Sequence, residues 1–504
     1  MRVSPSRRLT NFIPILIVLI ALIIVIIISS YDLDRAIVSQ QEDETTTTMV
    51  MPTSGDSEES ITSYTDALIK APLLLAQCTI VGIVFNHLVL SRIFYNRILM
   101  NFSRQNVTTQ TTLGTDIRLS LIIILSAVAL CVSCTGFLVL QVYNLSSELD
   151  LGFSDTLSIV MNTSVYTVWL LRIITSILVL VLSVIFYVLS GGNLIARRID
   201  GNGIRKIKNI VLCAILICGS INVISNGIVS HNAAAEFLPW LAISADWFHV
   251  MAVSIWVGGL FYILLILLRE IRSSNNDLIY GKEIDTTDEQ IIVRNSFALA
   301  LMLPYFSMIA IICLGVIGIS GLYMAWIQLQ STESLFDSLY GNILILKLCV
   351  IAPMIALGGY HQIKLHLVMV QIAQRGNISR EQLSVSSNVN RGARYDPFIR
   401  FSKTIKIESL IGITVLTISS FLTITSPPSM VHSSAQMQIA GSESANNNPG
   451  SNISDEDSEI TPRFTNAFTI AALILASIVL VMSFIYYRKS KQDLKSTLDL
   501  LKPQ

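Results

Sequence analysis

The sequence predicts an all-α polytopic membrane protein with about ten transmembrane helices, and three observations support this. First, 52% of the residues are hydrophobic and only 13% are charged, with a mean hydropathy of +0.64, whereas soluble domains usually carry about twice that charge. Second, apolar runs recur along the chain, and about 20 apolar helical residues are enough to cross a bilayer core. Third, these runs are much longer than the roughly 10 alternating residues of a membrane barrel strand.

The apolar runs place the expected helices in order along the chain. Their estimated ranges are 12–29, 65–90, 119–143, 165–190, 209–229, 238–268, 297–327, 343–366, 408–426 and 466–487. Basic residues gather in alternate loops, as they do on the cytoplasmic side of membrane proteins: Arg197 and Arg198 follow one span, whereas Glu148 and Asp150 follow the span before it. We therefore expect a multi-pass plasma membrane protein with both termini in the cytoplasm.

Composition divides the chain into six segments. We expect an N-terminal anchor or uncleaved signal (1–30), an outside disordered tether (31–63), an eight-helix membrane domain (64–427), an outside disordered loop (428–464), a C-terminal transmembrane helix (465–487) and a cytoplasmic tail (488–504). The tether and the loop are rich in Ser, Thr, Asn and acidic residues, which favours disorder. The zero net charge is the sum of a basic and an acidic face, and nothing in it indicates a nucleic-acid partner.

The eight-helix domain resembles an internal duplication of two four-helix units. Gly82 aligns with Gly258, and Gly136 near the outer end of the third span aligns with Gly321 near the outer end of the seventh. A repeat of four helices preserves direction, so the two halves would be parallel rather than inverted.

A small set of polar and sulfur-bearing residues predicts a functional site near the outside. Asp246 and His249 lie three residues apart on one helical face, while His231 follows the previous span and Met324 lies near the outer end of the seventh. Ionisable groups inside a bilayer usually face a cavity or a partner. Imidazole with thioether suits copper, whereas carboxylate with imidazole also admits zinc or a proton relay. The alternative is that Asp246 and His249 form hydrogen bonds that join helices.

Other intramembrane candidates carry weaker signals. Cys131 and Cys134 form a C-x-x-C pattern that would suit cuprous ion, although cysteine is also an ordinary small apolar residue in helices, and we favour packing. His87, His361 and His366 lie near the inner ends of their spans, where they would meet the lipid headgroups. A b-type haem would need two histidines facing each other across helices at equal depth.

Short motifs recur in a fixed order along roughly residues 65–430. They are Ser230-His231-Asn232-Ala233, Asp246-Trp247-Phe248-His249 running into Ile255-Trp256-Val257-Gly258-Gly259-Leu260, Phe306-Ser307, Ser320-Gly321-Leu322-Tyr323, Tyr340-Gly341, Leu346-Lys347-Leu348 and Thr425-Ser426-Pro427-Pro428. In these stretches the chain resembles the copper resistance D family of membrane proteins (CopD, PcoD).

The resemblance implies copper ion transport across the plasma membrane, in copper resistance or homeostasis, by a protein that is not an enzyme. The family's histidine positions fall on His231 and His249, and Trp256, Gly258 and Gly259 would shape the packing around them. Copper is then the metal bound or moved, and the expected partners are an external soluble copper carrier and the lipid bilayer.

The expected mechanism is an outer vestibule that receives copper and an inner relay. His231, Met324 and Met251 would take the ion from its carrier, and His249 with Asp246 would pass it inward. The sequence has no Walker A motif, so movement would be passive or driven by ion gradients. Two alternatives remain open: a b-type haem electron carrier, and a copper sensor or assembly factor that does not transport.

Overall fold

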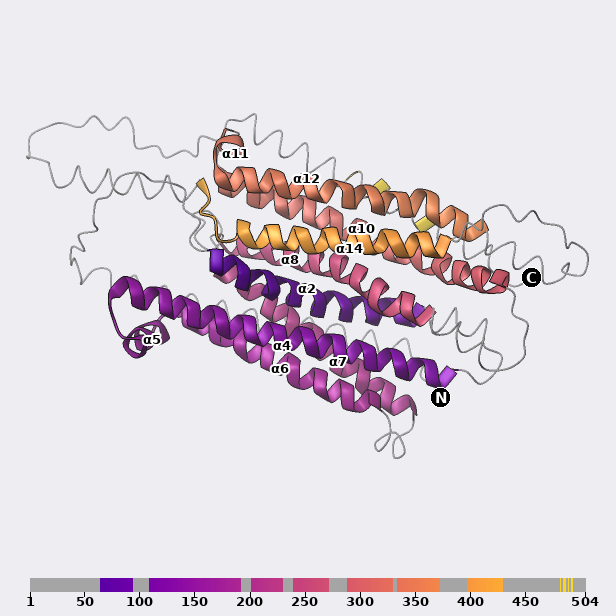
Figure 1. The fold of residues 1–504 in the computed structure, drawn as a ribbon, viewed down its shortest axis with the longest axis horizontal. Helices are drawn as coiled ribbons and strands as arrows, with labels where there is room; N and C mark the ends of the chain where they lie inside the picture. Colours follow the sequence, from indigo (N-terminus) through magenta and orange to yellow (C-terminus); the bar gives the residue numbers. More distant parts are fainter. Residues whose placement is uncertain are drawn as a thin grey trace, which may run out of the picture.

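The computed structural model describes residues 64–93, 108–191, 201–229, 239–271, 288–329, 333–371 and 397–428, with a few isolated residues between 481 and 492. Eight long helices run side by side (Figure 1). They are α2 (Tyr64–Ile93), α4 (Thr108–Leu149), α6 (Ser164–Gly191), α7 (Gly201–Ile228), α8 (Pro239–Tyr262), α10 (Asp288–Leu329), α12 (Leu339–Tyr360) and α14 (Pro397–Leu422). Each is long and apolar enough to cross a membrane, so the predicted class of an all-α polytopic membrane protein is confirmed.

Four shorter elements complete the described fold. Helices α5 (Phe153–Met161) and α11 (Ser334–Asp337) lie in connections at one end of the bundle, which we call the α11 end. Helices α8 and α12 each continue through a π-helical turn, η3 (Ile263–Leu267) and η4 (His361–Leu365), near the opposite end, which we call the η4 end. Such turns occur mostly as local bulges and frequently at functional sites.

The eight inner spans expected from the sequence are all helices, with different ends. The expected spans 12–29 and 466–487, both outside tethers and the C-terminal tail lie outside the described residues. Helix α14 begins at Pro397 rather than near residue 408, because its first turns are amphipathic: Phe401 and Ile405 are buried while Arg400 and Lys403 are exposed. An average of hydropathy over a window misses such a turn, since its apolar and polar residues cancel.

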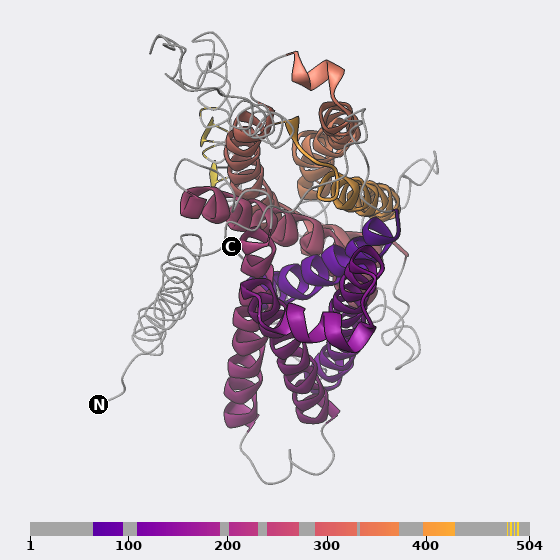
Figure 2. The same cartoon turned by 90° about the vertical axis from the view of Figure 1, so that its left-hand side faces the viewer.

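The helices form two groups that meet along α2 and α8. Helices α2, α4, α6 and α7 pack in a closed ring, whereas α8 packs on α10, and α12 packs mainly on α14. The view along the bundle shows the indigo and purple helices on one side and the orange helices on the other (Figure 2). The groups correspond to the two halves of the predicted duplication.

The contact between α2 and α8 depends on two glycines. A Cβ atom on Gly82 would lie 1.9 Å from the Ser254 carbonyl oxygen, and one on Gly258 would lie 2.6 Å from the Gly82 Cα. The Ser254 hydroxyl also donates to the Cys78 Sγ at 3.3 Å. Small residues let membrane helices approach this closely. The two glycines that align in the predicted repeat therefore lie against each other at the centre of the molecule.

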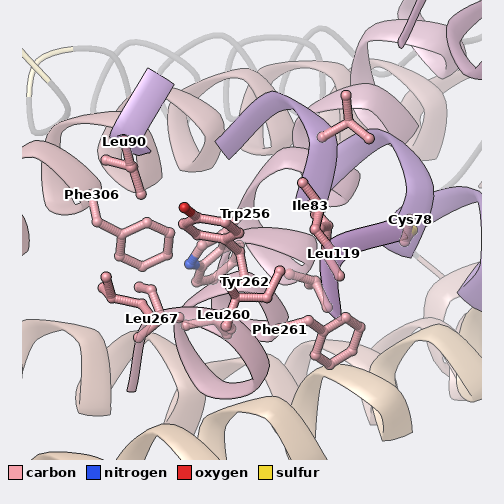
Figure 3. Packing of buried hydrophobic residues seen from close by; sticks show 14 of the residues in the cluster. Cys78, Ile83, Leu90, Leu119, Trp256, Leu260, Phe261, Tyr262, Leu267 and Phe306 are labelled. Atoms are coloured by element: carbon pink, nitrogen blue, oxygen red, sulfur yellow. The ribbon is translucent and has the colours of Figure 1, made fainter. Parts of the chain in front are cut away.

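The next residue, Gly259, extends this close packing to α10. A Cβ atom there would lie 2.5 Å from the Phe306 ring and 2.9 Å from the Asn86 side-chain nitrogen. That nitrogen donates to the Ile255 carbonyl at 2.9 Å, so α2 and α8 are also joined by a hydrogen bond. Figure 3 shows the apolar core around this point, where Trp256 of α8 lies near Phe306. The Gly-Gly pair thus fixes the position of α8, the helix that carries Asp246 and His249.

Candidate metal site

His249 is held against α10 by a hydroxyl and a glycine. Its Nδ1 lies 3.0 Å from the Ser320 Oγ, and a Cβ atom on Gly321 would lie 3.1 Å from the His249 Cε1. The hydroxyl proton of Ser320 goes to the Val316 carbonyl at 2.6 Å. The Ser320 oxygen therefore accepts, so His249 Nδ1 carries a proton and donates it. In the neutral ring this leaves the lone pair on Nε2, the atom that would bind a metal.

Asp246 lies one turn closer to the α11 end and faces a different neighbour. A Cβ atom on Gly227 of α7 would lie 3.2 Å from the Asp246 Oδ2. Lys347 of α12 and Arg172 of α6 both interact electrostatically with this carboxylate. Asp246 and His249 share one face of α8 by their spacing, but they pack toward different helices: Asp246 toward α7 and His249 toward α10.

Arg172 is bound mainly to α7. Its Nε donates to the Ser225 Oγ at 2.7 Å and its Nη2 to the Ser225 carbonyl at 2.8 Å, while its guanidinium lies 4.3 Å from the centre of the Trp169 ring. Asn222 donates to the Arg172 carbonyl at 3.0 Å. The two bonds to Ser225 satisfy a buried guanidinium inside the first group of helices. Lys347 interacts electrostatically with both Asp246 and His249.

Met324 lies on the same face of α10 as Gly321, three residues further toward the α11 end. Since α8 and α10 run in opposite directions, Met324 is at about the depth of Asp246. His231 lies outside the described residues. Within the part of the chain that the structure describes, no three His, Cys, Asp or Glu side chains are grouped closely enough to hold a metal. The set of His231, His249, Asp246 and Met324 therefore stays a prediction.

Sequence reasoning did not identify the role of Ser320, whose hydroxyl fixes the proton on His249. The signals in the sequence were its place beside Gly321 in the predicted repeat and in the stretch Ser320-Gly321-Leu322-Tyr323 that carries the family resemblance. Conversely, three histidines expected at the headgroups are buried: the exposed fractions of His87, His361 and His366 are 7%, 4% and 2%. The reason for two of them is contact with a neighbouring helix: His87 lies against Tyr262, and His361 lies against Phe401 and Thr404 of α14.

The C-x-x-C pair gives no sign of a thiolate site. Cys134 is fully buried against the core and Cys131 is half-buried, and both are free cysteines. Each described cysteine lies in a helix that could span the membrane, as the sequence predicted. The arrangement is in keeping with packing, the interpretation favoured from the sequence.

Comparison with known proteins finds a match to one protein family. Residues 300–422 match the family model described as copper resistance protein D, CopD. The copper transport protein CutJ of Bacillus subtilis (strain 168) is 29% identical over 189 residues, which is 37% of this chain and 26% of that protein. The alignment thus spans about a quarter of that relative's length. No solved structure matches the chain.

The matched segment contains α12, α14 and most of α10, and with them Ser320, Met324 and Lys347. Together with the eight helices, it confirms the resemblance predicted from the sequence. The chain is a multi-pass membrane protein whose residues 300–422 match the family model of copper resistance protein D.

Proposed function

We propose that this protein transports copper ions across the plasma membrane, with the His249 imidazole as the central ligand. The observation that carries the proposal is the hydrogen bond from His249 Nδ1 to Ser320, which leaves the Nε2 lone pair available inside the membrane. Metal-binding histidines commonly have their second nitrogen held by such a bond. The CopD match and the copper transport relative support copper as the ion.

The residues at the depth of His249 suit a monovalent copper ion. Met324 supplies a soft thioether, which together with imidazole favours cuprous ion. Asp246 would neutralise the arriving charge. Lys347 already interacts with Asp246, so in the empty state it serves as the counter-ion, and an arriving cation competes with it. Charged groups in a bilayer need such partners.

Delivery and exit complete the proposal. His231 and the methionines of the outside tethers would receive copper from a soluble carrier, and His249 would pass it inward, with both termini in the cytoplasm. Directionality then depends on the ion gradients and on the carrier, because a chain of ligands conducts both ways. A membrane role of the transporter type, rather than catalysis, fits the CopD match.

The first experiment measures copper in the purified full-length protein. We expect about one copper per wild-type chain in detergent, less than one tenth of that in His249→Gln, and no Soret absorption. The matched control is His87→Gln. His87 is also buried, but it lies beside Tyr262 of α8 and not against α10, so this variant should bind as much copper as the wild type. Equal copper in wild type and His249→Gln would refute the role of His249.

Flux in proteoliposomes separates transport from the alternatives. Cuprous ion should enter vesicles with the wild-type protein and fail to enter with His249→Gln. Copper binding without flux would instead indicate a sensor or assembly factor. A Soret band with iron would indicate a haem electron carrier.

A further inference from the structure

The predicted repeat has opposite charges at one position of its two halves. Gly82 of α2 and Gly258 of α8 align, and they lie against each other in the structure. Lys70 lies 12 residues before Gly82, and Asp246 lies 12 residues before Gly258. The first half therefore has a cation where the second half has the carboxylate of the candidate metal site.

The residue that faces this position is a cation in both halves. In the second half Asp246 interacts electrostatically with Lys347 of α12, and in the first half Lys70 interacts with Arg172 of α6. Arg172 and Lys347 are each the ninth residue of their helix. The same pair of positions thus joins an acid to a base in one half and two cations in the other.

The hydrogen bonds of the two cations go to neutral groups. Lys70 is half-buried, and its Nζ donates to the Thr423 carbonyl at 3.3 Å. Arg172 is 5% exposed and uses Nε and Nη2 on Ser225, which leaves Nη1 for another acceptor. Neutral partners do not cancel the repulsion between two like charges.

A stacked pair of aromatic rings lies beside the two cations. Lys70 Nζ lies 5.2 Å from the centre of the Phe137 ring, and the Arg172 guanidinium lies 4.3 Å from that of Trp169. The two ring centres are 4.8 Å apart. Trp169 is 1% exposed, and its indole Nε1 has no hydrogen-bond partner. Since buried polar groups are nearly always satisfied, a donor beside Arg172 lacks an acceptor.

The nearby carboxylates do not balance the cations. Asp66 interacts with Lys70, and Asp246 interacts with both Arg172 and Lys347. Among the described residues that interact in this way, three cations thus accompany two carboxylates. Charges inside a membrane protein need partners. One monovalent anion would balance this group.

We infer that the first group of helices binds a small monovalent anion, with chloride as the simplest case, at Lys70 and Arg172 near the α11 end. The Lys70 ammonium and the Arg172 Nη1 supply the charge, and the Trp169 indole supplies a further N–H donor. Groups of this kind make charge-assisted hydrogen bonds to anions. The inference goes beyond the proposed function and does not depend on copper.

The test measures chloride binding to copper-free, full-length protein in detergent, by line broadening of the chlorine nuclear magnetic resonance signal. Gluconate, which is too large for the interior of a helix bundle, keeps the ionic strength constant. We expect the wild-type protein to broaden the chloride line, and bromide to reverse the broadening by competition.

Two variants of one position and a matched control locate the site. Lys70→Gln should weaken chloride binding about 10–100-fold, the range for a lost hydrogen bond to a charged group. Lys70→Asp gives the first half the charge pair of the second half and should abolish binding. The control Lys364→Gln removes an exposed lysine at the η4 end and should leave the chloride affinity unchanged.

Several results would overturn the inference. One is equal broadening in the wild type, Lys70→Gln and Lys70→Asp. Another is an equal loss in Lys364→Gln, which would indicate that chloride gathers on the basic surface. Should the Lys70 variants fail to fold, hydrogen exchange in the wild type decides: replacing gluconate by chloride must slow exchange in segments 66–76 and 166–176, and no slowing there refutes the site. Each of these results leaves the proposed copper function intact, because no copper is present.

Discussion

Substituting Gly82 by alanine should destabilise the protein strongly, because the new methyl group has no room between α2 and α8. The added Cβ would lie 1.9 Å from the Ser254 carbonyl oxygen, whereas real Cβ contacts are essentially never under 3.0 Å. The difference, 3.0 − 1.9 = 1.1 Å, is the least distance by which the helices must separate. The obstacle is backbone, so no side-chain rotation can relieve it.

The cost follows from the packing that this separation disrupts. A gap of about 0.5–1 Å removes roughly a quarter to a half of the dispersion energy of each contact it opens. Overpacked cores usually lose about 1–3 kcal/mol, and a backbone obstacle places Gly82→Ala at the upper end, about 3 kcal/mol. The loss should outweigh the gain of up to about 1 kcal/mol that alanine brings to a helix interior.

The assay is the free energy of unfolding in mixed micelles, titrated with a denaturing detergent. Gly136→Ala is the matched control, since a Cβ on Gly136 of α4 would meet nothing within 4 Å; its stability should stay at the wild-type value or rise slightly. If Gly82→Ala and Gly136→Ala unfold at the same detergent fraction, the close contact of α2 and α8 is not what stabilises the fold.

Three further predictions concern the polar residues around His249. Ser320→Ala should weaken copper binding about 10–100-fold by releasing the imidazole, whereas Ser320→Thr keeps the hydroxyl and most of the affinity; copper titration measures both. Lys347→Gln should strengthen copper binding, because it removes a positive charge near the ion; the gain is about 1–2 kcal/mol for charges roughly 8–16 Å apart at an effective dielectric constant near 20. The control Lys364→Gln, at the other end of the same helix, should leave the copper affinity unchanged. Equal affinities in the two variants would contradict the counter-ion role of Lys347. Arg172→Lys should lower stability by about 1–3 kcal/mol, because lysine cannot reproduce the two bonds to α7; Arg205→Lys, at an exposed position, should have no effect in the same unfolding assay.

The helices were predictable because the bilayer imposes a length and a composition that can be read residue by residue. All eight inner spans were found in this way, and so were the positions of the cysteines inside them. The ends were less accurate: the first turns of α14 alternate between buried Phe401 and exposed Lys403, and such turns have no net hydropathy. The same effect hid His361 inside the bundle.

The candidate site was predictable only as a list of side chains. Spacing put Asp246 and His249 on one face of α8, but spacing is silent about which helices pack against that face. The structure directs Asp246 to Gly227 of α7 and His249 to Ser320 of α10. The hydroxyl that decides the proton on His249 is 71 residues away along the chain, and no local pattern contains it.

By itself the sequence determined that the chain is an all-α membrane protein with imidazole, carboxylate and thioether side chains in its spans, since hydropathy and residue chemistry are properties of single positions and short runs. The tertiary structure decided which lone pairs face an open position, because that depends on contacts between helices far apart in sequence. The imidazole of His249 is directed by Ser320. A hydrogen bond fixes the tautomer of an imidazole only when folding brings its partner within about 3 Å, and this is why the ligand atoms could not be assigned from the sequence.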